Sequence, residues 1–343
     1  MIRKVGIVSL SHGTIGKESV SFEVNIGVRR LEAMGLEVRF LPHARMGVAH
    51  LREHPEDRAS DLLAAFRDPE IDLILCALGG DDTVRLLPWL FDHDELTLAV
   101  TQKPFLGFSD TTGNHLMLHK LGISTFYGQS FLADLCELSE DMLPYTRHYF
   151  EELIHTGTIR EVRPSEVWYS SRKHFTPDQV GVPHPSHPDR GWELLQGPSR
   201  FSGPILGGCI DSIYDMLEGE EYRELQFLAE KYRLFPDKED WRGRILLLES
   251  SEMLMPPEVY RRALQLLKER GVFTAVSGVL VGKPMDERYQ EEYHRLLVEV
   301  IDDPRLPILA NLNIGHALPR CILPFGTEAR VDAEAQVIRF GTK

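Results

Sequence analysis

Residues 103–114 read Lys-Pro-Phe-Leu-Gly-Phe-Ser-Asp-Thr-Thr-Gly-Asn. A short apolar run ends in Gly-Phe-Ser-Asp and passes directly into a helical pattern over residues 114–121, which predicts a sharp turn from strand to helix at Ser109. Such a turn lifts a hydroxyl out of the sheet, and the start of the helix offers free backbone N–H groups to an oxyanion. A serine that only caps the helix is the alternative, because Thr111 stands where the usual Gly-x-Ser-x-Gly turn has its second glycine.

Strand and helix patterns alternate on both sides of this stretch. Short connections between them predict right-handed βαβ units and hence a parallel sheet. The most continuous apolar run precedes residue 79 and belongs in the middle of that sheet, where both faces are buried. We expect strands at residues 5–10, 36–41, 71–78 and 123–128, and helices at residues 59–66 and 143–154.

A pair of glycines follows the central strand, in the sequence Gly79-Gly80-Asp81-Asp82-Thr83. Paired glycines let the backbone approach a ligand closely and direct N–H groups at it. Because parallel strands end at one edge of a sheet, this loop and the Ser109 turn are predicted to share a ligand crevice. A tight turn with an Asp or Thr cap is the simpler interpretation. A P-loop is excluded, since no Lys-Ser/Thr follows, and a dinucleotide fingerprint near Gly13 is incomplete.

The second half has a different organisation. Residues 161–200 mix prolines with histidines, which favours a linker or active-site loop between domains at residues 1–160 and 201–343. Trp168 and Trp192 flank this segment and could cover a flat substrate group or anchor the loop. In the second domain we expect strands at residues 244–249, 275–281 and 307–312, helices at residues 257–270 and 290–301, and a hairpin at residues 329–340.

Composition limits the class of protein. The 343 residues have an apolar fraction of 43% and a formal net charge of −14, with no long basic run, which argues against nucleic acid as a partner. No apolar run is long enough to span a bilayer, and no signal peptide is evident at the N-terminus, so we expect a cytoplasmic protein. The four cysteines are scattered and are expected to be reduced and buried.

Three residues have the chemistry of a serine hydrolase. Ser109, Glu249 and His316 each fall just beyond an apolar strand, where loops project into a crevice. A serine nucleophile needs a base within hydrogen-bond distance and a carboxylate that fixes the imidazole tautomer. Loop residues that only cap and bridge are the alternative, since the sequence does not prove that the three side chains converge.

Metal-dependent hydrolysis is the main competing chemistry. His115 and His119 stand four residues apart on one predicted helix, which is the spacing of two zinc ligands, but no Glu follows the first His. Two helix-surface or interface histidines are the favoured interpretation, because many helices meet this spacing by chance. Asp81 and Asp82 with Glu249 could bind Mg²⁺, although a solvated turn also accounts for the aspartates.

Five separated motifs together resemble the LD-carboxypeptidase family of serine peptidases, and the resemblance covers nearly the whole chain. It implies an α/β fold with an N-terminal flavodoxin-like parallel-sheet domain, a C-terminal α/β domain with a small β-barrel-like sheet, and a homodimer. The motifs are Gly79-Gly80-Asp81-Asp82-Thr83 with Arg85-Leu86-Leu87-Pro88, Gly107-Phe108-Ser109-Asp110-Thr111-Thr112, Gly207-Gly208, Leu247-Leu248-Glu249 and Gly315-His316.

The resemblance also implies roles for individual residues. Ser109 would be the nucleophile, His316 the general base and Glu249 its orienting carboxylate. The backbone N–H groups of Gly80 and Asp110 would form the oxyanion hole, and no metal or organic cofactor would be required. The expected substrate-binding residues are Gly79, Asp81, Asp82, Trp168, Trp192, Gly207 and Gly208.

Two branches of this family differ in substrate. Muramoyl-tetrapeptide carboxypeptidases release a terminal D-alanine from murein peptides, whereas microcin C immunity peptidases cut the bond between a peptide or amino acid and a nucleotide-like group. The Gly-Gly-Asp-Asp-Thr loop and Gly207-Gly208-Cys209-Ile210-Asp211 look more like the second branch, in which an aromatic residue of a mobile loop stacks on the nucleobase. A small peptide or peptidyl-nucleotide substrate is therefore expected. A protein that sequesters its ligand without cleaving it, and a nucleotide-using enzyme, remain as alternatives.

Overall fold

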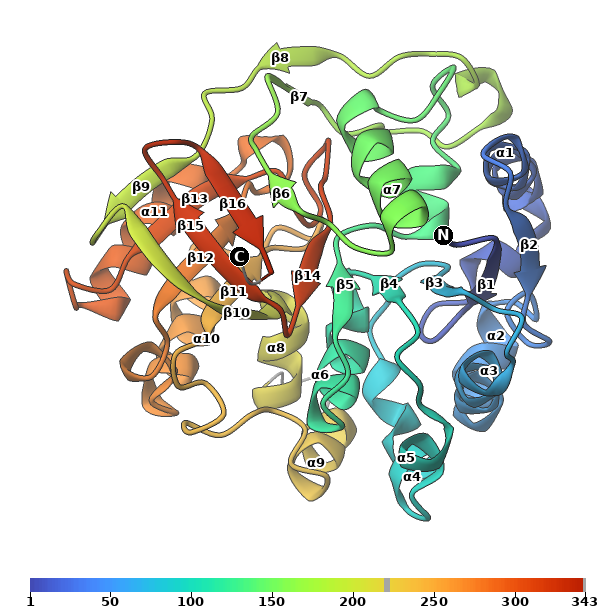
Figure 1. Cartoon of the computed structure of the whole chain (residues 1–343), viewed down its shortest axis with the longest axis horizontal. Coiled ribbons are helices and arrows are strands. Elements are labelled where there is room, and N and C mark those ends of the chain that lie inside the picture. Colours follow the sequence, from blue (N-terminus) through green and yellow to red (C-terminus); the bar gives the residue numbers. More distant parts are fainter. Residues whose placement is uncertain (219–222, 342–343) are drawn as a thin grey trace.

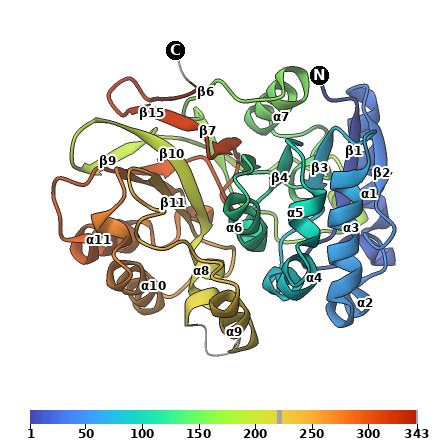
Figure 2. The same ribbon diagram turned by 60° about the horizontal axis from the view of Figure 1, so that its bottom comes forward.

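The computed structural model describes residues 1–218 and 223–341. Two sheets lie side by side, and helices pack around both (Figures 1 and 2). The prediction of an α/β fold in two parts is confirmed. None of the helices in the described ranges is long and apolar enough to cross a membrane.

The N-terminal sheet has six strands in the order β14-β5-β4-β3-β1-β2. Strands β1 to β5 are parallel in the order 2-1-3-4-5, which is the flavodoxin-like arrangement. Strand β3 lies in the middle and is buried at every position, as its continuous apolar sequence predicts. The strands are β1 (Lys4–Val8), β2 (Glu37–Phe40), β3 (Leu73–Cys76), β4 (Phe105–Gly107), β5 (Thr125–Tyr127) and β14 (Leu323–Phe325).

Helices of this part follow the expected alternation, and α3 packs against β1 while α6 packs against β5. They are α1 (Ser21–Ala33), α2 (Val48–Glu53), α3 (Pro55–Arg67), α4 (Leu87–Phe91), α5 (Glu95–Ala99), α6 (Thr112–Lys120) and α7 (Pro144–Thr156). Short 3₁₀ helices span Thr14–Gly16, Glu18–Val20, Thr83–Leu86, Ser109–Thr111, Pro177–Gln179, Val272–Thr274 and Met285–Glu287, and a π-helix spans Phe131–Leu135.

The second sheet has eight strands in the order β6-β16-β15-β10-β11-β12-β13-β9. Its long strand β10 pairs antiparallel with β15 in its first half and parallel with β11 in its second half. The strands are β6 (Glu161–Val162), β9 (Glu193–Gln196), β10 (Arg200–Cys209), β11 (Ile245–Glu249), β12 (Gly278–Gly282), β13 (Ile308–Leu312), β15 (Glu328–Asp332) and β16 (Val337–Phe340). The helices are α8 (Ile210–Leu217), α9 (Arg223–Lys231), α10 (Pro257–Glu269) and α11 (Gln290–Ile301).

Two expectations are refined by this sheet. The small barrel-like sheet corresponds to β6, β16, β15 and the first half of β10, which is an open sheet and not a closed barrel in the described part of the chain. Residues 161–200, expected as a linker or loop, supply the edge strands β6 and β9 and a separate two-stranded ribbon of β7 (Val167–Tyr169) and β8 (Ser186–Pro188).

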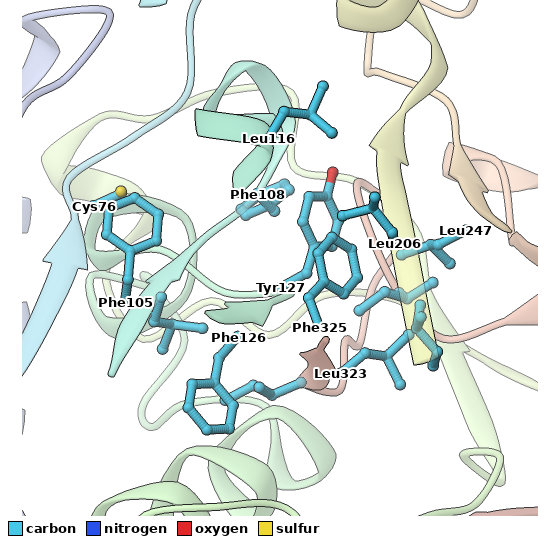
Figure 3. Packing of buried hydrophobic residues seen from close by; sticks show 14 of the residues in the cluster. Cys76, Phe105, Phe108, Leu116, Phe126, Tyr127, Leu206, Leu247, Leu323 and Phe325 are labelled. Carbon is cyan, nitrogen blue, oxygen red and sulfur yellow. The ribbon is translucent and has the colours of Figure 1, made fainter. Parts of the chain in front are cut away.

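A continuous core joins the two halves of the molecule (Figure 3). Strand β14 comes from the C-terminal part of the chain but pairs antiparallel with β5 of the first sheet. The rings of Phe325 on β14 and Tyr127 on β5 stack with centroids 5.1 Å apart, next to Leu206 of β10 and Leu247 of β11. This shared core fixes the carboxyl ends of β4 and β11 relative to each other.

Candidate active site

Ser109 lies on the sharp turn that the sequence predicts. It follows β4, begins a 3₁₀ helix that runs into α6, and has a φ of +67°. A non-glycine residue in this left-handed region costs about 1–2 kcal/mol, so surrounding contacts must hold it there. The Ser109 N–H donates to the Tyr127 hydroxyl at 3.1 Å, and the Thr112 hydroxyl donates to the Ser109 carbonyl at 2.7 Å. The turn leaves the Ser109 hydroxyl directed at the second half of the chain.

The structure brings Ser109, His316 and Glu249 together in one chain of hydrogen bonds. Glu249 is the last residue of β11, and His316 lies on the loop that follows β13. Strands of the second sheet therefore position both residues. His316 Nε2 is 3.0 Å from Ser109 Oγ, and His316 Nδ1 is 2.7 Å from Glu249 Oε2. With its proton on Nδ1, this imidazole has the geometry to accept a proton from the Ser109 hydroxyl.

Glu249 is almost fully buried, and both of its carboxylate oxygens are occupied. Oε1 accepts the Tyr127 hydroxyl at 2.6 Å, while Oε2 also accepts the His316 backbone N–H at 3.3 Å. Gly315 is required here, because a Cβ on it would come within 2.2 Å of Oε2. Sequence reasoning missed Tyr127, which connects the carboxylate to the Ser109 turn. Its position at the end of β5, next to β4, is the signal that could have identified it.

A second carboxylate also faces the histidine. Glu252 Oε2 lies 3.0 Å from His316 Nε2, the same nitrogen that faces Ser109. Burial lowers the pKa of His316, but Glu249 and Glu252 outweigh it and raise this pKa to about 10. The hydrogen bond from His316 in turn lowers the pKa of Glu252 to about 2. His316 is therefore held as an imidazolium in this arrangement. No sequence motif indicated Glu252.

The glycine loop lies directly against Ser109. A Cβ on Gly79 would come within 2.7 Å of Ser109 Oγ and 3.2 Å of the Asp110 backbone nitrogen. The backbone of residue 79 therefore packs against Ser109 and this N–H at a distance that only glycine allows. Gly80 has a φ of +156°, and a Cβ on it would meet Ser11 Oγ at 2.2 Å. The two glycines therefore allow a close approach that no other residue permits.

The side chain of Asp110 secures this loop. Its Oδ2 accepts the Ser11 hydroxyl at 2.5 Å and the Thr83 N–H at 2.9 Å, and burial raises its pKa to about 6. Ser11 Oγ in turn accepts the Asp81 N–H at 3.1 Å. Asp110 and Ser11 thus tie together the loops after β1, β3 and β4. Sequence reasoning did not single out Ser11, although it lies in a loop that follows a strand.

The structure gives Asp82 a structural partner. Arg58 is fully buried and donates to Asp82 Oδ1 at 2.5 Å and to Asp82 Oδ2 at 3.2 Å. Both carboxylate oxygens of Asp82 are therefore engaged by one guanidinium, which weighs against the magnesium hypothesis. This Arg58–Asp82 pair anchors the glycine loop to α3, the helix that carries Arg58.

Gly207 and Gly208 are placed against protein atoms. A Cβ on Gly207 would come within 2.1 Å of the Leu247 carbonyl, and one on Gly208 within 2.4 Å of Thr112 Oγ1. The Cys209 N–H donates to the same Thr112 hydroxyl at 3.0 Å. These contacts explain the glycines by close packing of β10 on β11 and α6. Their contact with substrate stays a prediction.

The two tryptophans have different surroundings. Trp192 is only 6% exposed, and its backbone N–H donates to Gln336 at 2.7 Å. Trp168 is partly exposed on β7 and stacks on His187 with centroids 4.2 Å apart. The next residue, Tyr169, donates its N–H to the Leu318 carbonyl at 2.9 Å, so β7 runs beside the His316 loop. Lys283 Nζ also lies 5.4 Å from the centroid of the Trp168 ring, and Trp168 is the more exposed of the two tryptophans.

His115 and His119 do not have the surroundings of zinc ligands. Both ring nitrogens of His115 are used inside the protein, by Thr125 Oγ1 at 2.7 Å and by the Gly107 carbonyl at 3.1 Å. Burial lowers the pKa of His115 to about 3 and that of His119 to about 4. In the described ranges, the residues close enough together to share a metal ion are Cys209, Glu249 and His316. Glu249 and His316 are hydrogen-bonded to each other.

Comparisons with known proteins identify the family of this chain. The sequence model described as "LD-carboxypeptidase N-terminal domain" matches residues 5–128, and that of the "LD-carboxypeptidase C-terminal domain" matches residues 202–331. A putative carboxypeptidase of Treponema pallidum is 28% identical over 318 residues, which cover 90% of this chain and 84% of that protein. The microcin C7 self-immunity protein MccF of Escherichia coli is 23% identical over 286 residues, covering 81% and 76%.

A solved structure is similar over the full length. The MccF-like protein from Streptococcus pneumoniae, crystallised in complex with AMP, is 55% identical, with a TM-score of 0.98 over 99% of each chain. E. coli MccF without ligand has the same fold, with a TM-score of 0.80 at 21% identity over 99% of this chain and 96% of that one.

Proposed function

Since the chain belongs to the LD-carboxypeptidase family of serine peptidases, we propose that it hydrolyses the bond between an amino acid or short peptide and a nucleotide-like group. Ser109, His316 and Glu249 are the residues that carry out this reaction. The single observation behind the proposal is the hydrogen-bonded chain from Ser109 Oγ through His316 to Glu249, which starts on a strained strand-to-helix turn.

In the proposed mechanism, Ser109 Oγ attacks the carbonyl carbon while His316 Nε2 accepts the hydroxyl proton. The tetrahedral intermediate collapses when His316 gives this proton to the leaving nitrogen, which leaves an acyl group on Ser109. Water then attacks the acyl-enzyme with His316 again as the base. Glu249 keeps the His316 proton on Nδ1 and stabilises the imidazolium, and Tyr127 holds the other oxygen of Glu249.

The oxyanion is held by the backbone N–H groups of Gly80 and Asp110. This assignment is supported by the close packing of the glycine loop against Ser109 Oγ and the Asp110 nitrogen, which depends on glycine at residue 79. Preorganised donors of this kind contribute about 3–4 kcal/mol each to the transition state. The buried contacts of Ser11, Asp110 and Arg58 hold the donors in place before substrate arrives.

Replacing Gly79 by alanine is expected to lower kcat/KM by at least about 100-fold, the cost of losing one oxyanion donor. The added methyl group would lie 2.6 Å from Ser109 Cβ and 3.2 Å from the Asp110 nitrogen, so it would displace Ser109 and the Asp110 N–H from each other's proposed positions around the oxyanion. Steady-state kinetics measures the effect, and circular dichroism checks that the variant folds. An unchanged kcat/KM would show that the oxyanion lies elsewhere.

The nucleotide-like part of the substrate is supported by relatives. The 55% identical protein from S. pneumoniae was crystallised with AMP, and E. coli MccF with aspartyl sulfamoyl adenosine and with glutamyl sulfamoyl guanosine. A purine base offers a flat face that a partly exposed tryptophan can cover. Trp168, beside the His316 loop, is the residue we assign to this contact.

Replacing Trp168 by alanine is expected to raise KM for an aminoacyl-sulfamoyl-adenosine about 5- to 150-fold, since stacking on one base contributes about 1–3 kcal/mol. Trp168→Phe keeps a flat ring and should recover most of the loss. Steady-state kinetics on both variants provides the measurement. Equal KM values for wild type and Trp168→Ala would remove Trp168 from the binding site.

A substrate panel tests the proposed function. Wild-type protein is incubated with an aminoacyl-sulfamoyl-adenosine and with a murein tetrapeptide, and products are followed by mass spectrometry. We expect release of sulfamoyl adenosine from the first compound. Loss of D-alanine from the tetrapeptide alone would place the protein with its relatives named as murein peptide carboxypeptidases. Tight binding without cleavage of either compound would indicate a sequestering protein.

A further inference from the structure

Glu252 lies on a turn that is fixed at both ends by buried groups. The turn is closed by the Leu254 N–H, which donates to the Ser251 carbonyl at 3.1 Å. Ser251 is pinned to Asp211 of α8 by its N–H at 2.9 Å and its hydroxyl at 2.8 Å. At the other end, the Tyr293 hydroxyl donates to the Met255 carbonyl. The backbone that carries Glu252 is therefore anchored, although the side chain itself is 58% exposed.

The carboxylate of Glu252 competes with Ser109 for one hydrogen atom. Glu252 Oε2 and Ser109 Oγ both lie 3.0 Å from His316 Nε2, which carries at most one N–H. When Nε2 acts as the base it must be unprotonated, and its lone pair would then face a carboxylate. Glu252 as placed here thus stabilises a histidine that cannot accept the serine proton.

A second cation, Arg320, lies close enough to Glu252 to help lower the pKa of its carboxyl. Arg320 is the nearby cation, and it is already engaged by the His316 carbonyl at 3.3 Å and by Asp134 at 3.3 Å. The remaining titratable groups that face the imidazole are acidic or neutral. They are Glu249 at the end of β11, Asp211 on α8 and the thiol of Cys209 at the end of β10. A cationic group of the substrate would therefore be the complementary partner of Glu252 once this carboxylate leaves His316.

We infer that Glu252 binds the free ammonium group of the residue whose carbonyl Ser109 attacks, an inference that rests on the proposed function. The α-nitrogen of that residue is two bonds from the attacked carbon. The carboxylate, which contacts the same histidine nitrogen as Ser109 Oγ, is within reach of it. Aminoacyl compounds with a free α-amino group are therefore the preferred substrate class over N-acylated ones.

This contact also couples recognition to catalysis. In the free enzyme Glu252 pairs with the His316 imidazolium. When the substrate ammonium takes over Glu252, His316 loses one of the two carboxylates that keep it protonated and can release the Nε2 proton to solvent. The same exchange places the scissile carbonyl beside Ser109. Binding of the free amino group thus favours the unprotonated form of His316, which can act as the base.

The test compares two substrates that differ only in N-acetylation of the aminoacyl-sulfamoyl-adenosine. Wild type should cleave the free amine with a kcat/KM about 10-fold or more above that of the acetylated compound, the effect of one charge pair in a partly exposed site. In Glu252→Gln this preference should fall to about 2-fold or less. Glu258→Gln, which removes an exposed carboxylate from the first turn of α10, serves as the matched control and should keep the preference.

The pH profile distinguishes this function from a structural one. Removing a negative charge from beside His316 lowers the pKa of the imidazolium in the free enzyme. The acidic limb of kcat/KM should therefore move to lower pH in Glu252→Gln. The acidic limb of kcat for the free amine should stay in place, because bound substrate has already displaced Glu252.

The outcomes separate this inference from the proposed function. Cleavage of both compounds by wild type without a preference, or a preference that survives in Glu252→Gln, would overturn the assignment of Glu252 while the peptidase function stands. If wild type cleaved neither compound, the proposed function would fail, and the inference would fail with it.

Discussion

Replacing Ser109 by alanine is expected to lower kcat by about 10⁴-fold or more while leaving the protein folded. The variant lacks the nucleophile, and only oxyanion stabilisation and substrate binding contribute to the residual rate. The contacts that hold the strained turn are made by the backbone of Ser109, with Tyr127 and Thr112 as partners, and they remain. The unfolding temperature should therefore stay within about 2 °C of wild type.

A matched control removes a serine hydroxyl elsewhere in the core. Ser9 is also buried, and its hydroxyl donates to the Ala44 carbonyl at 2.8 Å, away from His316. Ser9→Ala should therefore retain kcat while its stability falls slightly. Retention of more than about 1% of wild-type kcat in Ser109→Ala would mean that water or another group attacks the carbonyl directly.

Replacing Glu249 by glutamine is expected to lower kcat by about 10³- to 10⁴-fold, the cost of losing the carboxylate that orients a catalytic histidine. An amide has one oxygen, whereas Glu249 accepts from Tyr127 with Oε1 and from His316 Nδ1 and the His316 backbone with Oε2. If the amide N–H₂ faces His316, the imidazole must place its proton on Nε2, where it cannot act as a base. If it faces Tyr127, that hydroxyl loses its acceptor.

The pH dependence of Glu249→Gln provides a second readout. Glu249 is one of the two carboxylates that raise the pKa of His316 to about 10. Neutralising it lowers this pKa, so protonation of the base requires a more acidic solution and the acidic limb of kcat/KM moves to lower pH. A variant with kcat within about 10-fold of wild type and an unshifted limb would remove Glu249 from the mechanism.

Much of the first sheet could be predicted from sequence because its inner strands β3, β4 and β5 are buried at every position and regular helices separate the strands. The flavodoxin-like order and the strand-to-helix turn at Ser109 are both confirmed. The expected helix at residues 290–301 agrees with α11 (Gln290–Ile301) in both bounds. The turn and this helix have local signals, in the residues of one turn and in the hydrophobic periodicity, whereas the flavodoxin-like order is implied by the family resemblance.

Contacts between distant segments could not be predicted in this way. Strand β14 has only three residues, and no local pattern shows that it pairs with β5. The link from Tyr127 to Glu249 depends on this cross-sheet packing. Nothing in the sequence around Glu252 distinguishes it from an ordinary exposed turn residue. Only the folded chain shows that its Oε2 lies 3.0 Å from His316 Nε2. The sequence likewise predicted a loop where β6 to β9 form, because prolines and histidines obscured these short strands.

The most direct test of the mechanism is mass spectrometry of wild type and Ser109→Ala, at equal concentrations of folded protein, incubated with an aminoacyl-sulfamoyl-adenosine. We expect wild type to release the amino acid and sulfamoyl adenosine, and the variant to do so at a rate at least about 10⁴-fold lower. Comparable product formation by both proteins would contradict the mechanism.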